Sequence, residues 1–222
     1  MIKRMGKIMD ENGVKNFFSG YAAEFDSIYG DGSPRGFLLR ITDKLFRQSM
    51  YERYKRTISF IQSSKTKTVL DVGCGSGRYA VDLGKLGFNV TGVDLAEEML
   101  EIAEKNTKLS KIKGNKYILG SYLDIKLDSK FDVSILMGLF DYISNPVDIM
   151  KKLKKDTNGY ILASFPKPNG LLAWQRKIRY NMRNCQLFYY SFSDIENILN
   201  EAKISDFEIH NNHREFFLIA KI

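Results

Sequence analysis

The chain has 222 residues, of which 44% are hydrophobic and 27% are charged. These proportions predict one soluble globular protein with a full-sized core, and they argue against a disordered or fibrous chain. No apolar run approaches the roughly 20 residues of a membrane-spanning helix, and the N-terminal residues lack the apolar core of a signal peptide. We therefore expect a cytoplasmic protein.

The formal net charge is +8, which attracts polyanions, although scattered lysines are most often simply solvated. The arginines are clustered in an early and a late segment, at Arg35, Arg40, Arg47, Arg53 and Arg56 and at Arg176, Arg179 and Arg183. The two cysteines, Cys74 and Cys185, are far apart and have no metal-ligand spacing. We expect both to be reduced thiols, with Cys74 a small packing residue rather than a nucleophile.

The first predicted element is an amphipathic helix around Thr42–Gln62, and a glycine-rich turn comes after it. Val69 and Leu70 are typical of a buried parallel strand that leads into the turn. The three turn glycines, at positions 73, 75 and 77, let the backbone bend tightly and approach a ligand. A helix at Arg78–Leu86 follows, and its free N–H groups suit a carboxylate or an adenosine-like ligand.

A second strand, Asn89–Val93, follows this helix and is closed by Asp94. A carboxylate at that place can accept two hydrogen bonds from a ribose diol. The stretch therefore predicts half of a nucleotide-binding site. A dinucleotide fingerprint reads G-x-G-x-x-G, whereas this turn reads G-C-G-S-G and continues with Arg78, so the third glycine does not match.

The segments Asp71–Gly77, D-V-G-C-G-S-G, and Gly92–Asp94, G-V-D, resemble the first two motifs of class I S-adenosylmethionine-dependent methyltransferases. The resemblance implies that S-adenosylmethionine is the cofactor. It also implies that Asp71 and the glycine backbone hold its methionine end, while Asp94 holds its ribose. The alternative is a dinucleotide-binding or merely glycine-rich α/β turn.

The resemblance implies an α/β, Rossmann-like seven-stranded sheet in the order 3-2-1-4-5-7-6, with strand 7 antiparallel, helices on both faces and an N-terminal helical cap. We expect the cap at residues 1–64 and the core at 65–222, with a substrate-lid insertion at 166–191. The remaining elements are predicted at Ala96–Asn106 (helix), Tyr117–Leu119, Phe131–Met137 and Tyr160–Phe165 (strands), Ser193–Ala202 (helix), and Ile204–His210 and Glu215–Ile219 (strands). The short link at 120–130 leaves no room for more than a turn.

Further cofactor contacts are implied at strand ends and in the cap. Leu123 would be an apolar wall for the adenine, and Tyr122 or Asp124 could meet its exocyclic amine, although Asp124 is equally well a surface turn acid. The cofactor-binding candidates are Asp71, Gly73, Cys74, Gly75, Gly77, Asp94, Leu95, Tyr122, Leu123, Asp124, Met137, Gly138 and Tyr21.

The fourth strand is followed by a segment that we expect to be an exposed loop, Gly138 to Tyr142, before Asn145 or Ser144 caps a helix beginning at Pro146. Loops at the carboxyl edge of such sheets hold active sites. The catalytic candidates are Asp141, Tyr142 and His213. Asp141 is the best acid-base residue, with a turn-capping acid as the alternative, and alignment of the reacting groups can supply much of the rate without any base.

Acceptor binding is expected from the cap, the insertion and the last turn. On a helix, Arg176, Arg179 and Arg183 would share one face that suits phosphates or carboxylates. The substrate-binding candidates are Tyr29, Phe140, Trp174, Arg176, Arg179 and Arg214. The alternative for the insertion is a helical arm that packs on the domain or on a dimer partner.

The sequence is also distantly similar to O-methyltransferases of tetrapyrrole, quinone and sugar pathways. We expect methylation of a small acidic or phosphorylated metabolite or glycan precursor, most often on oxygen, by a metal-free monomer or homodimer. An RNA methyltransferase with the arginine face as backbone clamp is a second hypothesis. A non-catalytic cofactor-binding scaffold is a third.

Overall fold

The computed structural model describes residues 37–168 and 187–222, and side chains from residue 48 onward within the first range. Its elements are α2 (Phe37–Ser63), β1 (Thr68–Val72), α3 (Arg78–Lys85), β2 (Asn89–Asp94), α4 (Glu97–Leu109), β3 (Lys116–Leu119), β4 (Phe131–Leu136), α5 (Pro146–Asp156), β5 (Thr157–Pro166), α7 (Phe192–Glu201), β6 (Asp206–Asn211) and β7 (Glu215–Lys221). None of the described helices is long and apolar enough to cross a membrane.

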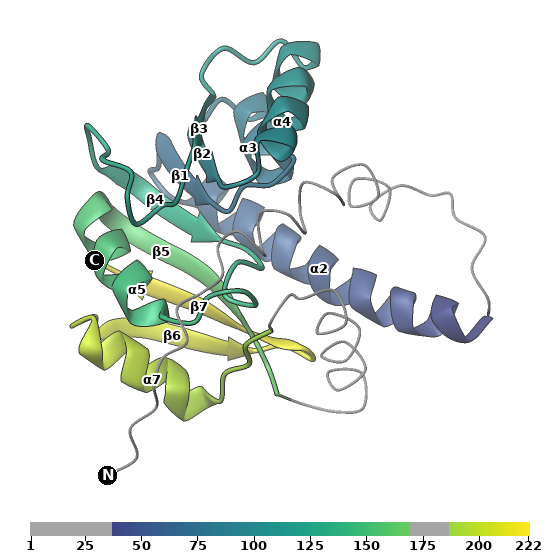
Figure 1. Ribbon diagram of the computed structural model, residues 1–222, viewed down its shortest axis with the longest axis vertical. Coiled ribbons are helices and arrows are strands. Elements are labelled where there is room, and N and C mark those ends of the chain that lie inside the picture. The colour runs from purple at the N-terminus through teal and green to yellow at the C-terminus, as the bar shows by residue number, and fades with distance from the viewer. Residues whose placement is uncertain (1–36, 169–186) are drawn as a thin grey trace.

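The strands form one sheet in the order β3-β2-β1-β4-β5-β7-β6. The pairs from β3 to β5 are parallel, and β7 runs antiparallel between β5 and β6. The predicted topology is therefore confirmed (Figure 1). Because the parallel strands all end at one edge, the loops after β1, β2, β4 and β5 meet there.

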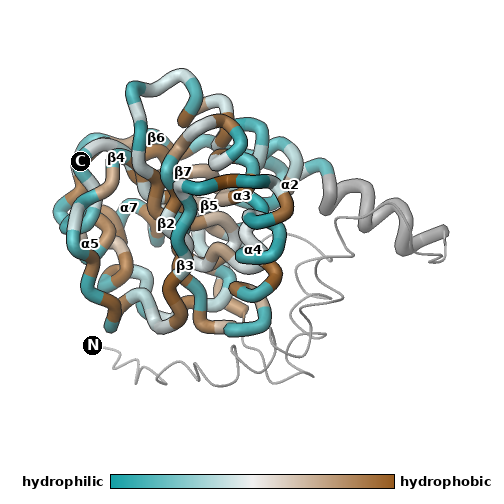
Figure 2. The backbone as a smooth tube through the Cα atoms, turned by 90° about the horizontal axis from the view of Figure 1, so that it is seen from above, coloured by the Kyte–Doolittle hydropathy of each residue, from teal (hydrophilic) through white to brown (hydrophobic). Residues whose placement is uncertain are grey.

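Hydrophobic side chains alternate between the two faces of the sheet. Val69 belongs to the cluster that contains Ala80 and Leu83 of α3, whereas Leu70 belongs to the cluster that contains the buried residues of α5 and α7. The sheet is therefore covered on both faces, and hydrophobic positions concentrate between the layers (Figure 2).

The second half of α2 is part of the core. Ile61 is fully buried with β1, β4 and β5 residues, and the Phe60 ring packs edge-on against Tyr160 at 5.0 Å between centroids. Thr57 is also fully buried and donates to the Arg53 carbonyl at 2.9 Å. The division into a cap at 1–64 and a core at 65–222 stays a prediction, since packing within the described residues is continuous across residue 64.

The predicted and observed bounds differ most at α2, which begins at Phe37 rather than around Thr42, and they differ also at β5. The strand was expected from Tyr160 and begins at Thr157, directly after α5 ends at Asp156. Thr157 is fully buried and pairs with Phe131 of β4, which extends the sheet at that end, and its hydroxyl lies 2.6 Å from the Ser134 hydroxyl. The link between β3 and β4 contains only turns, as predicted.

Candidate functional site

The loop after β1 is built by glycines in left-handed conformations. Gly73, Gly75 and Gly77 have φ angles of 72°, 52° and 77°, which residues with a Cβ rarely adopt. A Cβ on Gly77 would lie 2.7 Å from the Ala103 Cβ of α4, whereas a Cβ on Gly75 would meet no described atom within 4 Å. The loop thus packs tightly against α4 at Gly77 and opens onto unfilled space at Gly75.

Asp71 is the next-to-last residue of β1, just before this loop, and is 1% exposed. Its Oδ2 atom is buried and has no hydrogen-bond partner among the described residues. Burial, and then the nearby Asp94 carboxylate, raise the pKa of Asp71 to about 8. A buried acceptor without a donor is costly, so this site suits a ligand that brings an ammonium or N–H group.

Asp94 ends β2 and holds the same loop from the other side. Its Oδ2 accepts the Gly75 N–H at 2.8 Å, and its Oδ1 accepts the Ala96 N–H at 3.0 Å. Burial raises the pKa of Asp94 despite these bonds. Each carboxylate oxygen has a second lone pair, so the acid can orient the loop and still accept from a ribose diol.

Cys74 lies in the loop with its thiol buried. The Sγ atom would be 2.8 Å from a Cβ on Gly92 of β2, so the cysteine packs directly on the neighbouring strand. Burial raises the pKa of Cys74 well above its usual value, and Asp71 adds to the shift. Because the thiolate is the nucleophilic form, this environment supports the predicted packing role.

The predicted adenine-lining residues after β3 divide into two kinds. Leu123 is 43% exposed and Asp124 is also exposed, so both are available to a ligand. The Tyr122 side chain is buried, and its hydroxyl donates to Asp156 of α5 at 2.9 Å. The Tyr122 hydroxyl is therefore bonded within the core. Only the Tyr122 backbone could then contact the exocyclic amine of the adenine. Leu95, after β2, is half-buried.

The segment after β4 is not the exposed loop that the sequence predicts. Phe140 is fully buried and stacks on Phe165 of β5 with centroids 4.2 Å apart, while Asp141 and Tyr142 are each 7% exposed. The expectation fails because Phe140 also meets Tyr190 edge-on, which draws the turn onto the core. Phe140 is thus a core residue in the structure, and an acceptor contact from it stays a prediction only.

Two polar side chains lie near Gly138, and two more are bonded to its N–H or to Arg53; the sequence analysis missed three of these four as site residues. A Cβ on Gly138 would lie 3.7 Å from the Arg53 guanidinium nitrogens and 4.0 Å from Asp141 Oδ2. Ser164 of β5 accepts the Gly138 N–H at 2.9 Å, and Arg53 donates to Glu215 of β7 at 2.8 Å. Only the clustering of arginines had singled out Arg53. Met137, just before Gly138, is half-buried, and its sulfur accepts from Thr57 of α2 at 3.6 Å.

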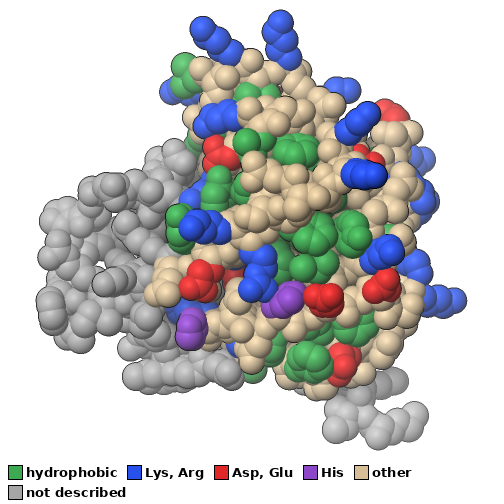
Figure 3. Space-filling view, turned by 180° about the vertical axis from the view of Figure 1, so that it is seen from behind, with side chains coloured by type: hydrophobic (Ala, Val, Ile, Leu, Met, Phe, Trp, Pro, Cys, Tyr) green, Lys and Arg blue, Asp and Glu red, His purple; other side chains and the backbone are tan. Residues whose placement is uncertain are grey.

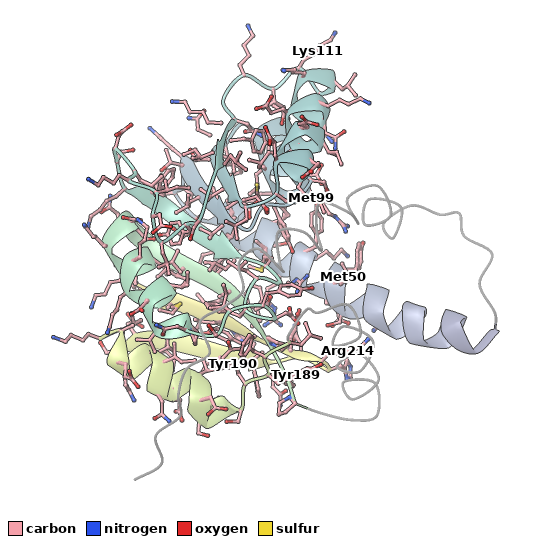
Figure 4. All side chains as sticks on the ribbon, in the orientation of Figure 1. Met50, Met99, Lys111, Tyr189, Tyr190 and Arg214 are labelled. Atoms are coloured by element: carbon pink, nitrogen blue, oxygen red, sulfur yellow. The ribbon has the colours of Figure 1, made fainter. Side chains whose placement is uncertain are left out.

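The β6–β7 turn lies at the same edge, as predicted, because Lys167 follows β5 and holds the turn. Its backbone N–H donates to the Arg214 carbonyl at 3.1 Å, and its ammonium donates to the Asn211 side chain and the Asn212 carbonyl. Burial lowers the pKa of Lys167. Figure 4 shows Arg214 at the tip of this hairpin, and His213 beside it is exposed.

Several predicted residues lie outside the described part of the structure. These are Tyr21, Tyr29, Trp174, Arg176 and Arg179. Among the described residues, no group of three or more His, Cys, Asp or Glu side chains could hold a metal ion.

Comparison with known proteins agrees with this geometry. Residues 63–205 match the family model described as a methyltransferase domain. The ubiquinone biosynthesis O-methyltransferase of Hydrogenovibrio crunogenus is 33% identical over 99 residues, which cover 44% of this chain and 41% of that protein. The corresponding enzyme of Rickettsia conorii is 30% identical over 132 residues, covering 60% of this chain and 40% of that protein. The chain thus spans about two fifths of the length of these relatives.

Solved structures show the same fold. Magnesium protoporphyrin IX methyltransferase of Synechocystis, with bound S-adenosylhomocysteine, has a TM-score of 0.73 at 19% identity and covers 96% of this chain and 99% of that one. A Haemonchus contortus phosphoethanolamine N-methyltransferase also has a TM-score of 0.73, at 15% identity, covering 96% of this chain and 59% of that one. From the family match, the sheet order and the two motif acids, the chain belongs to the class I S-adenosylmethionine-dependent methyltransferases.

Proposed function

We propose that the protein transfers a methyl group from S-adenosylmethionine to a small acidic or phosphorylated acceptor, with an oxygen as the methylated atom. The observation that carries the proposal is the pair of acids around the glycine loop: Asp71, with a buried acceptor atom that lacks a described donor, and Asp94, fixed by two backbone N–H groups. A bound cofactor with an ammonium group and a ribose diol satisfies both.

The cofactor half of the site has a role for each of its residues. Asp71 accepts from the ammonium of the methionine end, and Asp94 accepts from the ribose hydroxyls through its remaining lone pairs. Leu123 supplies an exposed apolar wall for the adenine. When bound, S-adenosylmethionine supplies a methyl group on a positively charged sulfur, already activated for transfer.

The acceptor half lies at the ends of β4, β5 and β7. Asp141 is the proposed hydrogen-bond partner or base for the acceptor hydroxyl, because it follows β4 and its Oδ2 would lie 4.0 Å from a Cβ on Gly138. Tyr142 and His213 are the second candidates. Tyr142 is 7% exposed and His213 is exposed, so Asp141 combines burial with a place at the site better than either.

Acidic or phosphorylated acceptors are favoured by the cations at this edge. Arg214 belongs to the β6–β7 turn, and Lys167 and Arg53 lie at the same edge, where they also bond the hairpin turn and Glu215. The solved Haemonchus structure contains phosphomonomethylethanolamine, a small phosphorylated acceptor. The choice of oxygen rests on the names of the relatives, which are O-methyltransferases of ubiquinone biosynthesis.

An RNA methyltransferase is the second candidate, and the net charge of +8 is its support. On the face in Figure 3, however, the lysine and arginine side chains are spread out rather than gathered in one stripe. A backbone clamp requires cations that follow the phosphates. For the small-molecule methyltransferase we also propose a cytoplasmic location and a monomeric or homodimeric state. The third candidate is a scaffold that binds the cofactor without catalysing transfer.

The test begins with calorimetric titration of S-adenosylmethionine, S-adenosylhomocysteine and NAD. Transfer of a labelled methyl group is then measured with 3,4-dihydroxybenzoate, phosphomonomethylethanolamine and total RNA as acceptors. The proposal is supported if S-adenosylmethionine and S-adenosylhomocysteine bind but NAD does not, and if label is transferred to 3,4-dihydroxybenzoate or phosphomonomethylethanolamine. Label on RNA alone favours the second candidate, and tight cofactor binding without transfer to any acceptor overturns the catalytic reading.

A further inference from the structure

Arg53, in the middle of α2, is bonded to two strands that are distant in sequence. Its Nη1 donates to the Ser164 hydroxyl of β5 at 3.2 Å and to Glu215 Oε2 of β7 at 2.8 Å. These partners are 111 and 162 residues away along the chain. The guanidinium therefore ties α2 to the carboxyl end of β5 and to the start of β7.

The Ser164 hydroxyl passes this connection on to the turn after β4. It accepts the backbone N–H of Gly138 at 2.9 Å, while Gly138 has a left-handed φ of 84°. The turn continues with a bond from the Tyr142 N–H to the Leu139 carbonyl at 2.9 Å. Asp141, the proposed partner of the acceptor, lies inside this turn. The path from Arg53 to Asp141 thus runs through one serine and one peptide N–H.

Burial makes this connection sensitive to the loss of the charge. The Arg53 and Glu215 side chains are each 11% exposed. Removing one member of a buried ion pair weakens the compensation of the other charge, which is costly. The nearby Lys167 also interacts with Glu215, but its ammonium donates to the Asn211 side chain and the Asn212 carbonyl. Among the described residues, Arg53 is the cation that bonds Glu215 directly.

The next residue of α2 makes a contrasting contact. The Tyr54 hydroxyl donates to Asp82 of α3 at 2.7 Å, and the Arg78 guanidinium lies 4.8 Å from the centre of the Tyr54 ring. Tyr54 thereby docks α2 onto the helix that follows the glycine loop. Adjacent residues of one helix contact the two halves of the site, so the effect of each can be measured separately.

We propose that Arg53 is a positioning residue: through Ser164 and Glu215 it orders the Gly138–Tyr142 turn, and so fixes Asp141 for the acceptor. α2 is then part of the acceptor site rather than only a cover. The ordering of the Gly138–Tyr142 turn is inferred from the contacts above, whereas its effect on turnover rests on the proposed function. Figure 4 agrees with this place for the helix, since Met50 of α2 and Arg214 of the hairpin are both drawn at that end of the sheet.

The first measurement is hydrogen exchange, which needs no acceptor. In Arg53→Lys, and in Ser164→Ala, which keeps the ion pair, we expect amide exchange within residues 138–142 to become about tenfold faster or more. Exchange in the loop at residues 73–77 should stay unchanged. Tyr54→Phe is the matched control on the same helix and should leave residues 138–142 protected. Unchanged exchange in both test variants would overturn the proposal.

The second measurement separates positioning from a general loss of structure. In Arg53→Lys, S-adenosylhomocysteine affinity should stay within about threefold, while kcat with 3,4-dihydroxybenzoate or phosphomonomethylethanolamine falls about 10- to 100-fold, because small misplacements are costly in methyl transfer. In Arg53→Ala, added guanidinium ion should restore part of the protection and part of kcat. An equal loss of cofactor affinity and kcat, without rescue, contradicts the proposal. Wild-type protein that transfers no methyl group refutes the proposed function, and the exchange result still decides the role of Arg53.

Discussion

The cofactor half and the acceptor half of the site are assembled in different ways. Gly75 and Asp94, which meet in the cofactor half, are 19 residues apart and belong to one strand, turn, helix and strand. Arg53 and Glu215, which meet in the acceptor half, are 162 residues apart. A local unit can be carried whole among related proteins, whereas the acceptor half depends on how distant elements pack. The comparison explains why the cofactor is easier to infer than the acceptor.

The largest expected effect is on the cofactor half. Replacing Asp94 with Ala removes the acceptor of the Gly75 and Ala96 N–H groups together with the proposed ribose contact. Loss of such bonds costs about 1–3 kcal/mol, so S-adenosylhomocysteine affinity should fall about 10- to 100-fold. Calorimetric titration measures this directly. The exposed Asp128, which is not a cofactor-binding candidate, is the control when replaced in the same way, and equal losses in both variants would remove the special role of Asp94.

The second effect, smaller than the first, concerns the proton on Asp71. Because its pKa is raised to about 8, the carboxyl is mostly protonated near neutral pH in the free protein. A cofactor ammonium pairs with the ionised form, so binding should release a proton. Between about pH 6 and about pH 7.5, affinity should rise with pH by up to about tenfold per pH unit. Titrations across this range test it, and Asp71→Asn should abolish the slope.

The raised pKa of Asp71 also determines how the stability of the folded protein changes with pH. In the unfolded chain Asp71 ionises near the usual aspartate pKa of 3.8, whereas in the folded protein its pKa is about 8 and it keeps its proton to that pH. The folded state therefore binds more protons between these values, and its stability falls as pH rises through them. Thermal unfolding of Asp71→Asn should show a smaller fall in Tm from pH 5 to pH 8 (about three units inside this window) than the wild type. An identical fall would show that Asp71 is not the group that titrates.

The two halves also differ in how well they follow from sequence. The glycine loop, Asp71 and Asp94 are predicted because each lies within one contiguous motif whose geometry is set locally. The exposure of Phe140 is predicted wrongly because it depends on Phe165 and Tyr190, which no local pattern connects to it. Arg53 appears in sequence only as one arginine among several, since its partners are set by the register of β5 and β7.

The smallest expected change in cofactor affinity is for a substitution of Tyr122. This residue tests whether its side chain contacts the core or the cofactor. Tyr122→Phe keeps the ring and removes the hydroxyl that donates to the buried Asp156 at 2.9 Å. Lys152 also bonds Asp156 at 2.9 Å, so the carboxylate keeps a partner, and the free energy of unfolding should fall by only about 1 kcal/mol. Denaturant unfolding measures this change.

Cofactor affinity should be unchanged in Tyr122→Phe, because the hydroxyl is directed to α5 and not to a ligand. Leu123→Ala is the matched variant at the next position, where the side chain is 43% exposed. There we expect the reverse pattern, with stability retained and S-adenosylhomocysteine affinity lowered by several-fold through loss of an apolar wall. A loss of affinity in Tyr122→Phe as large as that in Leu123→Ala would mean that the tyrosine hydroxyl serves the cofactor. The cofactor site would then begin at Tyr122 rather than at Leu123.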